Sequence, residues 1–284
     1  MKKSYVRIMT TLVLSLSVAL TLAGLAACTP NQEDATTSAT AYSETVNPEI
    51  QTILDHGVLR VGVKDDTPGF GFFNPEIEQY EGLEIDLAHL LAEEILGSRE
   101  AVEFTPVTAG TRGNLLDSKQ IDLVIATFTI REERTEFWNF SQYYFVDAVG
   151  LMVIEDSGLN RLSDFGGRTI AVIEASTTRE AIEQHIEDMS YDIAVNFQEF
   201  PTNQDAVAAL ESGQVDAFSV DKVILSGFLT EELVILPESF NPQEYGIASR
   251  LNSPYLTRLV DAFITQIKLD GTLEQLKAQN NVID

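Results

Sequence analysis

Mostly apolar short runs alternate with amphipathic segments along the chain. The short runs are rich in Val and Ile, which predicts strands buried on both faces. They cover residues 58–63, 102–107, 123–126, 169–173, 193–197, 217–220 and 233–236. The amphipathic segments predict helices over residues 49–56, 82–95, 115–118, 131–138, 179–189, 204–212, 222–229 and 254–279, the last broken near Gly271. Residues 64–73 are rich in Gly and Phe and predict a loop.

Strands that alternate with helices predict an α/β fold, in which parallel sheets carry helices on both faces. The alternation occurs twice. A long apolar strand at residues 147–154 is placed to cross between the two sets, and residues 245–248 are placed to return to the first. We therefore predict two lobes with a cleft and a two-strand hinge. The first lobe comprises residues 47–150 and 240–284, and the second comprises residues 151–239.

The N-terminus has a different pattern. Residues 1–7 are basic, residues 8–25 are almost wholly apolar, and Leu25-Ala-Ala-Cys28 follows. This sequence resembles the lipobox of bacterial lipoproteins, which implies a signal peptide over residues 1–27 and a lipid on Cys28. The alternative is an uncleaved anchor, since the apolar run is long enough to span a membrane. Residues 28–46 are polar and predict a disordered tether between membrane and fold.

Charge and cysteine content narrow the classes of partner. The formal net charge is −26; without residues 1–27 it becomes −29, since 15 basic residues then stand against 44 acidic ones. Such a surface repels nucleic acid and anionic lipid, so we expect neither as a partner. A small anion in a cleft is not excluded, because exposed charges are screened beyond about 8 Å at physiological salt. The chain contains a single cysteine, Cys28, and therefore cannot form an intrachain disulfide. We also expect the protein to be a monomer.

Signatures of catalysis are lacking. The three histidines fall on predicted helices, away from strand ends, and the chain has no His-Glu-x-x-His motif and no Gly-x-Ser-x-Gly elbow. With no cysteine beyond Cys28, a thiol nucleophile or thiolate metal site is excluded. We therefore expect a protein that is not an enzyme, with no metal site and no cofactor.

Three cations fall where predicted strands of the first lobe end. Lys64 ends the first strand, Arg112 lies in the second strand–helix turn, and Arg134 follows the third. Ligands of open α/β sheets bind outside the carboxyl ends of the strands, so these cations can converge on an anion. Each residue also has a structural interpretation: Lys64 can lie beside Asp65 and Asp66, and Arg112 can pair with Asp117 at the surface.

The second lobe offers complementary groups. Ser176 and Thr177 precede a predicted helix, and Asp221 follows a strand. Hydroxyls and free N–H groups at a helix start suit a carboxylate, and an aspartate suits an ammonium group. Asp221 can instead simply cap its helix.

Several segments resemble one known family. Residues 122–134 contain Asp122 and the run Thr127-Phe-Thr-Ile-Arg-Glu-Glu-Arg134, followed by Phe140-Ser-Gln-Tyr-Tyr144. These motifs, together with Gly82-Leu-Glu-Ile-Asp-Leu87, resemble the bacterial extracellular solute-binding proteins of family 3, which deliver polar amino acids to ABC importers. We interpret residues 82–87 as structural. The resemblance implies a two-lobed, periplasmic-binding-protein-like fold of type II, an extracytoplasmic location, and a permease with a cytoplasmic ATPase as partner.

The resemblance also implies roles for site residues. Arg134, Thr129 and Thr177 would hold the α-carboxylate of the ligand, beside Ser176, and Asp221 would hold its ammonium group. Residues 108–117, 124–130 and 215–222 look most like the aspartate/glutamate-binding branch. That branch would use Lys64 and Arg112, with Thr127 available, for the distal carboxylate. Phe70 matches a position at which the family often places a ring against the ligand; it can equally be a core residue.

Two alternatives stay open. Residues 201–204 lack the aromatic residue that the acidic-ligand branch can carry, so the choice between aspartate and glutamate is undecided. Another polar amino acid such as glutamine, or an enzyme of the same fold resembling cyclohexadienyl dehydratases, remains a rival.

Overall fold

The computed structural model describes residues 47–282. The predicted signal peptide, the lipidated Cys28 and the tether lie outside these residues. Within residues 47–282, no helix is both long enough and apolar enough to cross a bilayer.

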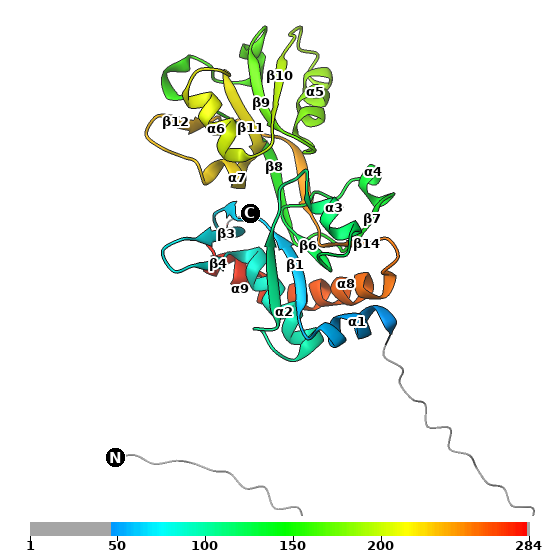
Figure 1. Ribbon diagram of the computed structural model, residues 1–284. Helices are drawn as coiled ribbons and strands as arrows, with labels where there is room; N and C mark the ends of the chain where they lie inside the picture. The colour runs from blue at the N-terminus through cyan, green and yellow to red at the C-terminus, as the bar shows by residue number, and fades with distance from the viewer. Residues whose placement is uncertain (1–46, 283–284) are drawn as a thin grey trace, which may run out of the picture. The chain divides into compact units, whose positions relative to one another are not determined.

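The first lobe is built on a five-stranded sheet of order β5-β1-β6-β14-β7 (Figure 1). Its strands are β1 (Leu59–Val63), β5 (Val102–Pro106), β6 (Leu123–Ile125), β7 (Trp138–Phe140) and β14 (Ala248–Arg250). The strands β5, β1 and β6 are parallel, and β14 is antiparallel to both of its neighbours. The helices of this lobe are α1 (Pro48–His56), α2 (Leu83–Leu96), α3 (Arg112–Asp117), α4 (Glu132–Thr135), α8 (Pro254–Leu269) and α9 (Thr272–Gln279).

The second lobe is built on a sheet of order β10-β9-β11-β8-β12, with β13 also paired to β8. Its strands are β8 (Phe145–Ile154), β9 (Thr169–Ile173), β10 (Asn196–Phe200), β11 (Ala217–Asp221), β12 (Leu233–Ile235) and β13 (Phe240–Tyr245). The helices are α5 (Thr178–Asp188), α6 (Asn203–Glu211) and α7 (Lys222–Ser226), with short 3-10 turns at Glu155–Ser157 and Leu162–Phe165.

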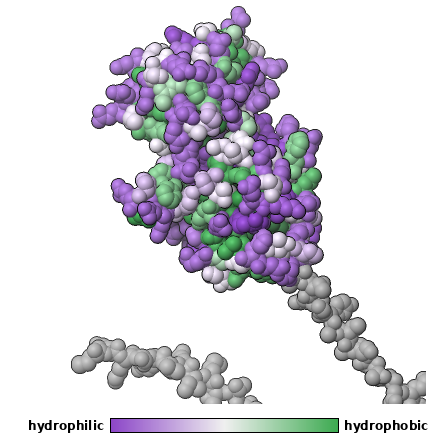
Figure 2. All heavy atoms as spheres, viewed as in Figure 1, coloured by the Kyte–Doolittle hydropathy of each residue, from purple (hydrophilic) through white to green (hydrophobic). Residues whose placement is uncertain are grey.

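Burial on both faces explains the continuous apolar runs of this second sheet. Along β8, Met152 packs into the cluster on one face, whereas its neighbours Leu151 and Val153 pack into the cluster on the other. Successive residues of a strand point to opposite faces, so the part of a strand that is covered on both sides is a continuous apolar run rather than an alternation. Figure 2 shows a mainly hydrophilic outer surface over both lobes in this view, as the acidic composition leads one to expect.

Two strands connect the lobes. In Figure 1, β8 and β13 run between the two sheets, and they pair antiparallel from Phe145 with Tyr245 to Val149 with Phe240. Tyr245 also forms an isolated bridge with Thr129, at the edge of the first lobe. The predicted two-lobed α/β fold is therefore confirmed. The residue boundaries that we assigned to the lobes stay a prediction.

Four local predictions differ from the structure. Residues 64–73 are not a simple loop, because β2 (Asp66–Thr67), β3 (Gly71–Asn74) and β4 (Gln79–Glu81) form a small antiparallel sheet. The helix expected over residues 131–138 stops after one turn, since Trp138 enters β7 and pairs with β14. The helix α3 begins at Arg112 rather than at residue 115. β10 begins at Asn196, in register with Thr169 of β9, rather than at residue 193.

Candidate functional site

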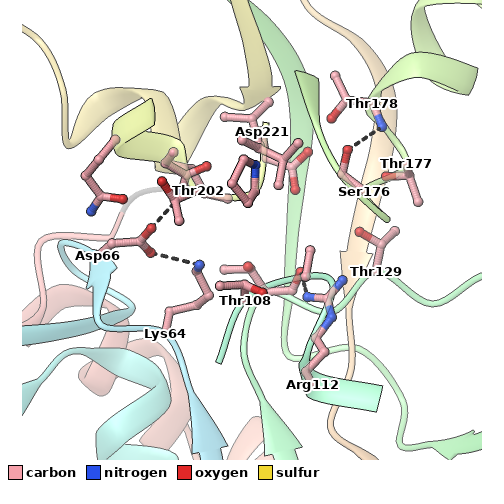
Figure 3. A pocket seen from close by; sticks show the side chains of 18 of the residues that line it. Lys64, Asp66, Thr108, Arg112, Thr129, Ser176, Thr177, Thr178, Thr202 and Asp221 are labelled. Carbon is pink, nitrogen blue, oxygen red and sulfur yellow. Dashed lines mark hydrogen bonds and ion pairs between the residues drawn. The ribbon is translucent and has the colours of Figure 1, made fainter. Parts of the chain in front are cut away.

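A cavity of about 350 Å³ lies between the lobes, and residues of both lobes line it. Among the predicted site residues, those lining the cavity are Lys64, Arg112, Thr127, Thr129, Arg134, Ser176, Thr177 and Asp221. In Figure 3 the first-lobe side chains of Lys64 and Arg112 face the opening from one side, and Asp221 and Ser176 face it from the other. The volume is at the small end of the range for ligand pockets, about 300–1,000 Å³.

The topology explains this convergence. Lys64 directly follows β1, Arg112 opens α3 after β5, and Thr127 follows β6. These three strands are parallel neighbours, so their carboxyl ends share one edge of the sheet. The second sheet contributes in the same way, because Asp221 ends β11 and Thr177 follows β9.

Arg112 is buried at the floor of the cavity, with 4% of its surface exposed. Its guanidinium lies 3.8 Å from the ring centroid of Phe128, and its Nη1 donates to the carbonyl of Ala126 at 2.7 Å. Its Nε is buried without a hydrogen-bond partner in residues 47–282. Burial, and then the positive charge of Arg134, lowers the pKa of Arg112 to about 9. Arg112 does not form the alternative surface pair with Asp117, because its guanidinium is buried; the Asp117 carboxylate instead accepts from the indole of Trp138 at 2.9 Å.

Arg134 shares the same aromatic platform, with its guanidinium 4.9 Å from the ring centroid of Phe128. Its Nη1 donates to the carbonyl of Thr129 at 2.8 Å, and its Nη2 reaches across the cleft to the carbonyl of Ala175 at 3.1 Å. Burial, and then the charge of Arg131, lowers the pKa of Arg134 to about 10. Neither guanidinium group has an ion-pair partner within 4.0 Å in residues 47–282. The more distant charge of Asp221, and at Arg112 also that of Glu84, only partly offsets the effect of burial.

Asp221 has the opposite imbalance. It occupies the N-cap position of α7, but its side chain makes no capping hydrogen bond. Its Oδ2 instead accepts from the hydroxyl of Tyr245 at 2.6 Å, and the same hydroxyl lies 3.2 Å from Oδ2 of Asp147. Burial, and then the charge of Asp147, raises the pKa of Asp221 to about 7. A cation in the cavity would restore its charge.

Lys64 is buried and paired with an acid. Its Nζ lies 2.9 Å from Oδ1 of Asp66. The other oxygen, Oδ2 of Asp66, accepts from Nδ2 of Asn203 at 2.8 Å, which links the first lobe to the second. Lys64 therefore lines the cavity, as expected of a ligand-binding cation, and also pairs with Asp66, as in the structural interpretation.

The hydroxyl groups are held by local contacts. Thr177 donates to Oε1 of Gln243, a buried residue of the crossing strand β13, at 2.8 Å. Ser176 accepts from the backbone N–H of Thr178 at 3.4 Å, beside the start of α5. Because the first N–H groups of a helix have no partner within the helix, this end of the cavity suits an anion.

Phe70 does not line the cavity. It is 1% exposed and packs edge-on against Phe145 and Tyr245, with ring centroids 5.0 Å and 6.1 Å away. The structure therefore supports the core interpretation of Phe70 and not a ring against the ligand.

The sequence did not single out Asp66, Phe128 and Asn203, although all three shape the site. The sequence indicates Asp66 only as a neighbour of Lys64, because it does not predict the short strand β2 that orients this aspartate. The guanidinium groups of Arg112 and Arg134 both lie over the ring of Phe128. Its position between Thr127 and Thr129 is the feature of the sequence that could have indicated this role. Asn203 had no signal along the chain, since its contact with Asp66 spans 137 positions.

No metal centre is evident in the part of the chain that the structure describes. Within residues 47–282, no group of three or more His, Cys, Asp or Glu side chains is placed to hold a metal ion.

Comparison with known proteins gives a consistent picture. Residues 59–281 match the profile of the bacterial extracellular solute-binding proteins, family 3. A glutamine-binding protein of Geobacillus stearothermophilus is 36% identical over 244 residues, covering 83% of this chain and 90% of that protein. The glutamate-binding protein GluB of Corynebacterium glutamicum is 26% identical over 241 residues, covering 80% and 79%.

Solved structures agree on the fold. An ancestral arginine-binding protein bound to arginine is 31% identical with a TM-score of 0.68, over 78% of this chain and 97% of that one. An ancestral amino acid-binding protein, a precursor of cyclohexadienyl dehydratase, is 28% identical with a TM-score of 0.70, over 81% and 98%.

Proposed function

This chain belongs to family 3 of the bacterial extracellular solute-binding proteins, and on that premise we propose that it binds aspartate or glutamate for an ABC importer. The family is extracytoplasmic, and the named relatives are binding proteins rather than enzymes. The coarse function is therefore the capture of an amino acid outside the cytoplasm.

One observation carries the preference for an acidic side chain. The buried guanidinium of Arg112, the partly buried guanidinium of Arg134 and the buried carboxylate of Asp221 meet in one cavity, and each is destabilised in its charged form. Buried charges need partners of opposite sign. An acidic amino acid offers two carboxylates and one ammonium group, which is the set that Arg112, Arg134 and Asp221 require.

The cavity has two ends with different tasks. At the amino-acid end, Arg134, Thr129, Ser176 and Thr177 hold the α-carboxylate, and Asp221 holds the ammonium group. At the side-chain end, Arg112, Thr127 and Lys64 hold the distal carboxylate. A guanidinium fork suits a carboxylate because two parallel N–H groups match its two oxygens.

Charge arithmetic supports an anionic ligand. Asp66 already compensates Lys64 at 2.9 Å. Asp65 also lines the cavity, but it is exposed to solvent and screened. The remaining charged residues of the lining, Arg112, Arg134 and Asp221, then leave a net charge of +1. An acidic amino acid carries −1 and completes the balance, whereas a neutral amino acid leaves one cation uncompensated.

Glutamine is the second candidate. The ion pair between Lys64 and Asp66 reduces the positive charge available for a second carboxylate. The relative from Geobacillus stearothermophilus is named a glutamine-binding protein, and so is a protein of Bacillus subtilis that is 31% identical to this chain over 239 residues.

The remaining parts of the proposal concern the partners. We infer that a lipid on Cys28 tethers a monomeric receptor to the membrane, and that a permease with a cytoplasmic ATPase accepts the ligand. Closure of the lobes is a population shift, which can be no larger than the preference of the ligand for the closed form.

A thermal-shift screen of the twenty L-amino acids on the chain from residue 29 onward tests the proposal. We expect glutamate and aspartate to raise the melting temperature most, because ligand binding to the folded state stabilises it. Stabilisation by glutamine with no response to either acidic amino acid would establish the second candidate instead. The Arg134→Ala variant is the control and should respond to no amino acid.

A further inference from the structure

The motif at residues 82–87 lies against the cavity wall, although it does not line the cavity. Gly82 has φ +124°, and a Cβ atom there would come within 2.2 Å of the carbonyl oxygen of Phe70. The start of α2 therefore packs directly on the backbone of Phe70, between β2 and β3. Glu84 lies in the first turn of this helix and is 0% exposed. A fully buried glutamate requires specific partners.

The partners of Glu84 belong to the site. Its Oε1 accepts from the backbone N–H of Thr127 at 2.6 Å and from the hydroxyl of Tyr144 at 2.5 Å. Thr127 lines the side-chain end and has φ +42°, a left-handed conformation that is costly for a residue with a branched side chain. The hydrogen bond from its N–H to Glu84 stabilises this conformation.

A short path connects Glu84 to the guanidinium of the side-chain end. Arg112 donates through Nη1 to the carbonyl of Ala126 at 2.7 Å and, more weakly, to that of Thr127 at 3.4 Å. Glu84 therefore holds one side of the peptide segment whose other side holds Arg112. A substitution of Glu84 should therefore affect both the position of the Arg112 guanidinium, through residues 126–127, and its electrostatic environment.

The second oxygen of Glu84 indicates an electrostatic role. Oε2 is buried and has no hydrogen-bond partner in the described part of the chain. Burial raises the pKa of Glu84 above its usual value, and its hydrogen bonds to Tyr144 and Thr127 and the charges of Lys64 and Arg112 offset this only in part. In turn, the negative charge of Glu84 favours the charged form of Arg112.

We propose that Glu84 is a specificity-determining residue that limits how strongly the side-chain end prefers a carboxylate over a neutral amide. It acts as a negative charge behind Thr127, partly compensating Arg112 and Lys64 from within the protein. This inference rests on the proposed amino-acid site, and it adds the residue that determines how well the site distinguishes glutamate from glutamine. It also replaces our interpretation of residues 82–87 as purely structural.

Two variants separate the charge of Glu84 from its hydrogen bonds. Glu84→Gln keeps an acceptor for Thr127 and Tyr144 and removes the charge. Glu84→Met removes both, at similar length. The exposed Glu94→Gln, on the same helix, is the matched control for the loss of one negative charge.

The measurement is the dissociation constant for glutamate and for glutamine, by calorimetry on each variant. We expect Glu84→Gln to raise the preference for glutamate over glutamine by about tenfold or more, because one charge roughly 12 Å away already has an effect of this size at an effective dielectric constant of about 20. Glu84→Met should raise this ratio similarly while weakening both ligands, because Thr127 loses its anchor. Glu94→Gln should leave the ratio unchanged.

The outcomes distinguish the two proposals. If wild-type protein binds glutamate or glutamine and neither Glu84 variant changes the ratio beyond twofold, the inference is overturned and the proposed function stands. If both ligands weaken in parallel in Glu84→Met and Glu84→Gln restores them without a change of ratio, Glu84 only positions Thr127, which also overturns it. Wild-type protein that binds neither amino acid overturns the proposed function itself.

Discussion

The two ends of the cavity differ in how far the protein compensates its own charges. At the amino-acid end, Arg134 donates to two backbone carbonyls, and Asp221 accepts from a tyrosine hydroxyl. Neither residue has an ion-pair partner within 4.0 Å in residues 47–282. At the side-chain end, Lys64 is paired with Asp66, and Glu84 lies behind Arg112.

This difference separates affinity from selectivity. The charges of the amino-acid end remain unpaired until a zwitterion arrives, so this end should contribute similar free energy for every amino acid. The side-chain end is already partly neutral, so its choice among side chains depends on small differences. A glutamate-binding and a glutamine-binding site can therefore share one framework and differ in a few charges at one end.

The largest expected effect is at the amino-acid end. Arg134→Ala should weaken every amino acid ligand by about 2–5 kcal/mol, because a buried carboxylate loses its charged donor. Calorimetry with glutamate and glutamine measures this, and the exposed Arg161→Ala is the control. A loss confined to one of the two ligands would break the proposed division between the ends.

A smaller and selective effect is expected at the other end. Arg112→Ala should cost glutamate about 1.5–3 kcal/mol, the range for hydrogen bonds to charged groups, and glutamine about 0.5–1.5 kcal/mol. The ratio of the two dissociation constants is the quantity to compare with that of the Arg134→Ala variant. Equal losses for both ligands would contradict the assignment of Arg112 to the distal carboxylate.

The pH dependence should come from the amino-acid end. The pKa of Asp221 is raised to about 7 in the ligand-free fold, first by burial and then by Asp147. An unfolded aspartate has a pKa of about 3.9. The stability that Asp221 contributes to the ligand-free protein is therefore fully present below that value and is lost as the pH rises through about 7.

Ligand affinity should change in the opposite sense, because the ammonium group requires the carboxylate form of Asp221. We expect affinity to be constant above pH 7 and to fall by up to about tenfold per pH unit below it. Asp147, Tyr245, Arg134 and Arg112 all act on this carboxylate. Calorimetry at a series of pH values tests this, with Asp221→Asn as a control that should bind weakly and show a flat profile.

The smallest expected effect concerns one of the hydrogen bonds between the lobes. Asn203→Ala removes the amide that donates to Asp66 across the cleft at 2.8 Å. We expect a loss of about 0.5–1.5 kcal/mol for all ligands, seen mainly as faster dissociation. Stopped-flow release measures it, and Asn196→Ala, whose amide stays within the second lobe, is the control. An unchanged release rate would show that this contact does not hold the closed form.

The sequence is sufficient to predict those site residues whose positions depend only on the topology of the sheets. Lys64, Arg112, Thr127 and Asp221 follow strands of a parallel sheet, and parallel strands bring their carboxyl ends together whatever the loops do. The apolar runs of β8 and β9 likewise predicted burial on both faces. These features follow from local patterns of a few residues.

Features that depend on tertiary contacts could not be predicted from local sequence patterns. The pairing of Trp138 with β14 overrode a helical pattern, and the small sheet around β2 turned Asp66 towards Lys64. Phe70 shows the same limit, because an aromatic residue next to a binding loop looks the same whether it faces the ligand or the core. Only its contacts with Phe145 and Tyr245 decide the matter.

A crystal structure of the chain from residue 29 onward with L-glutamate tests the central claim most directly. The account predicts the α-carboxylate on Arg134 and Thr177, the ammonium group on Asp221, and the distal carboxylate on Arg112. A glutamate bound in the reverse direction, or with its side chain pointing away from Arg112, would contradict the division of the cavity into two ends.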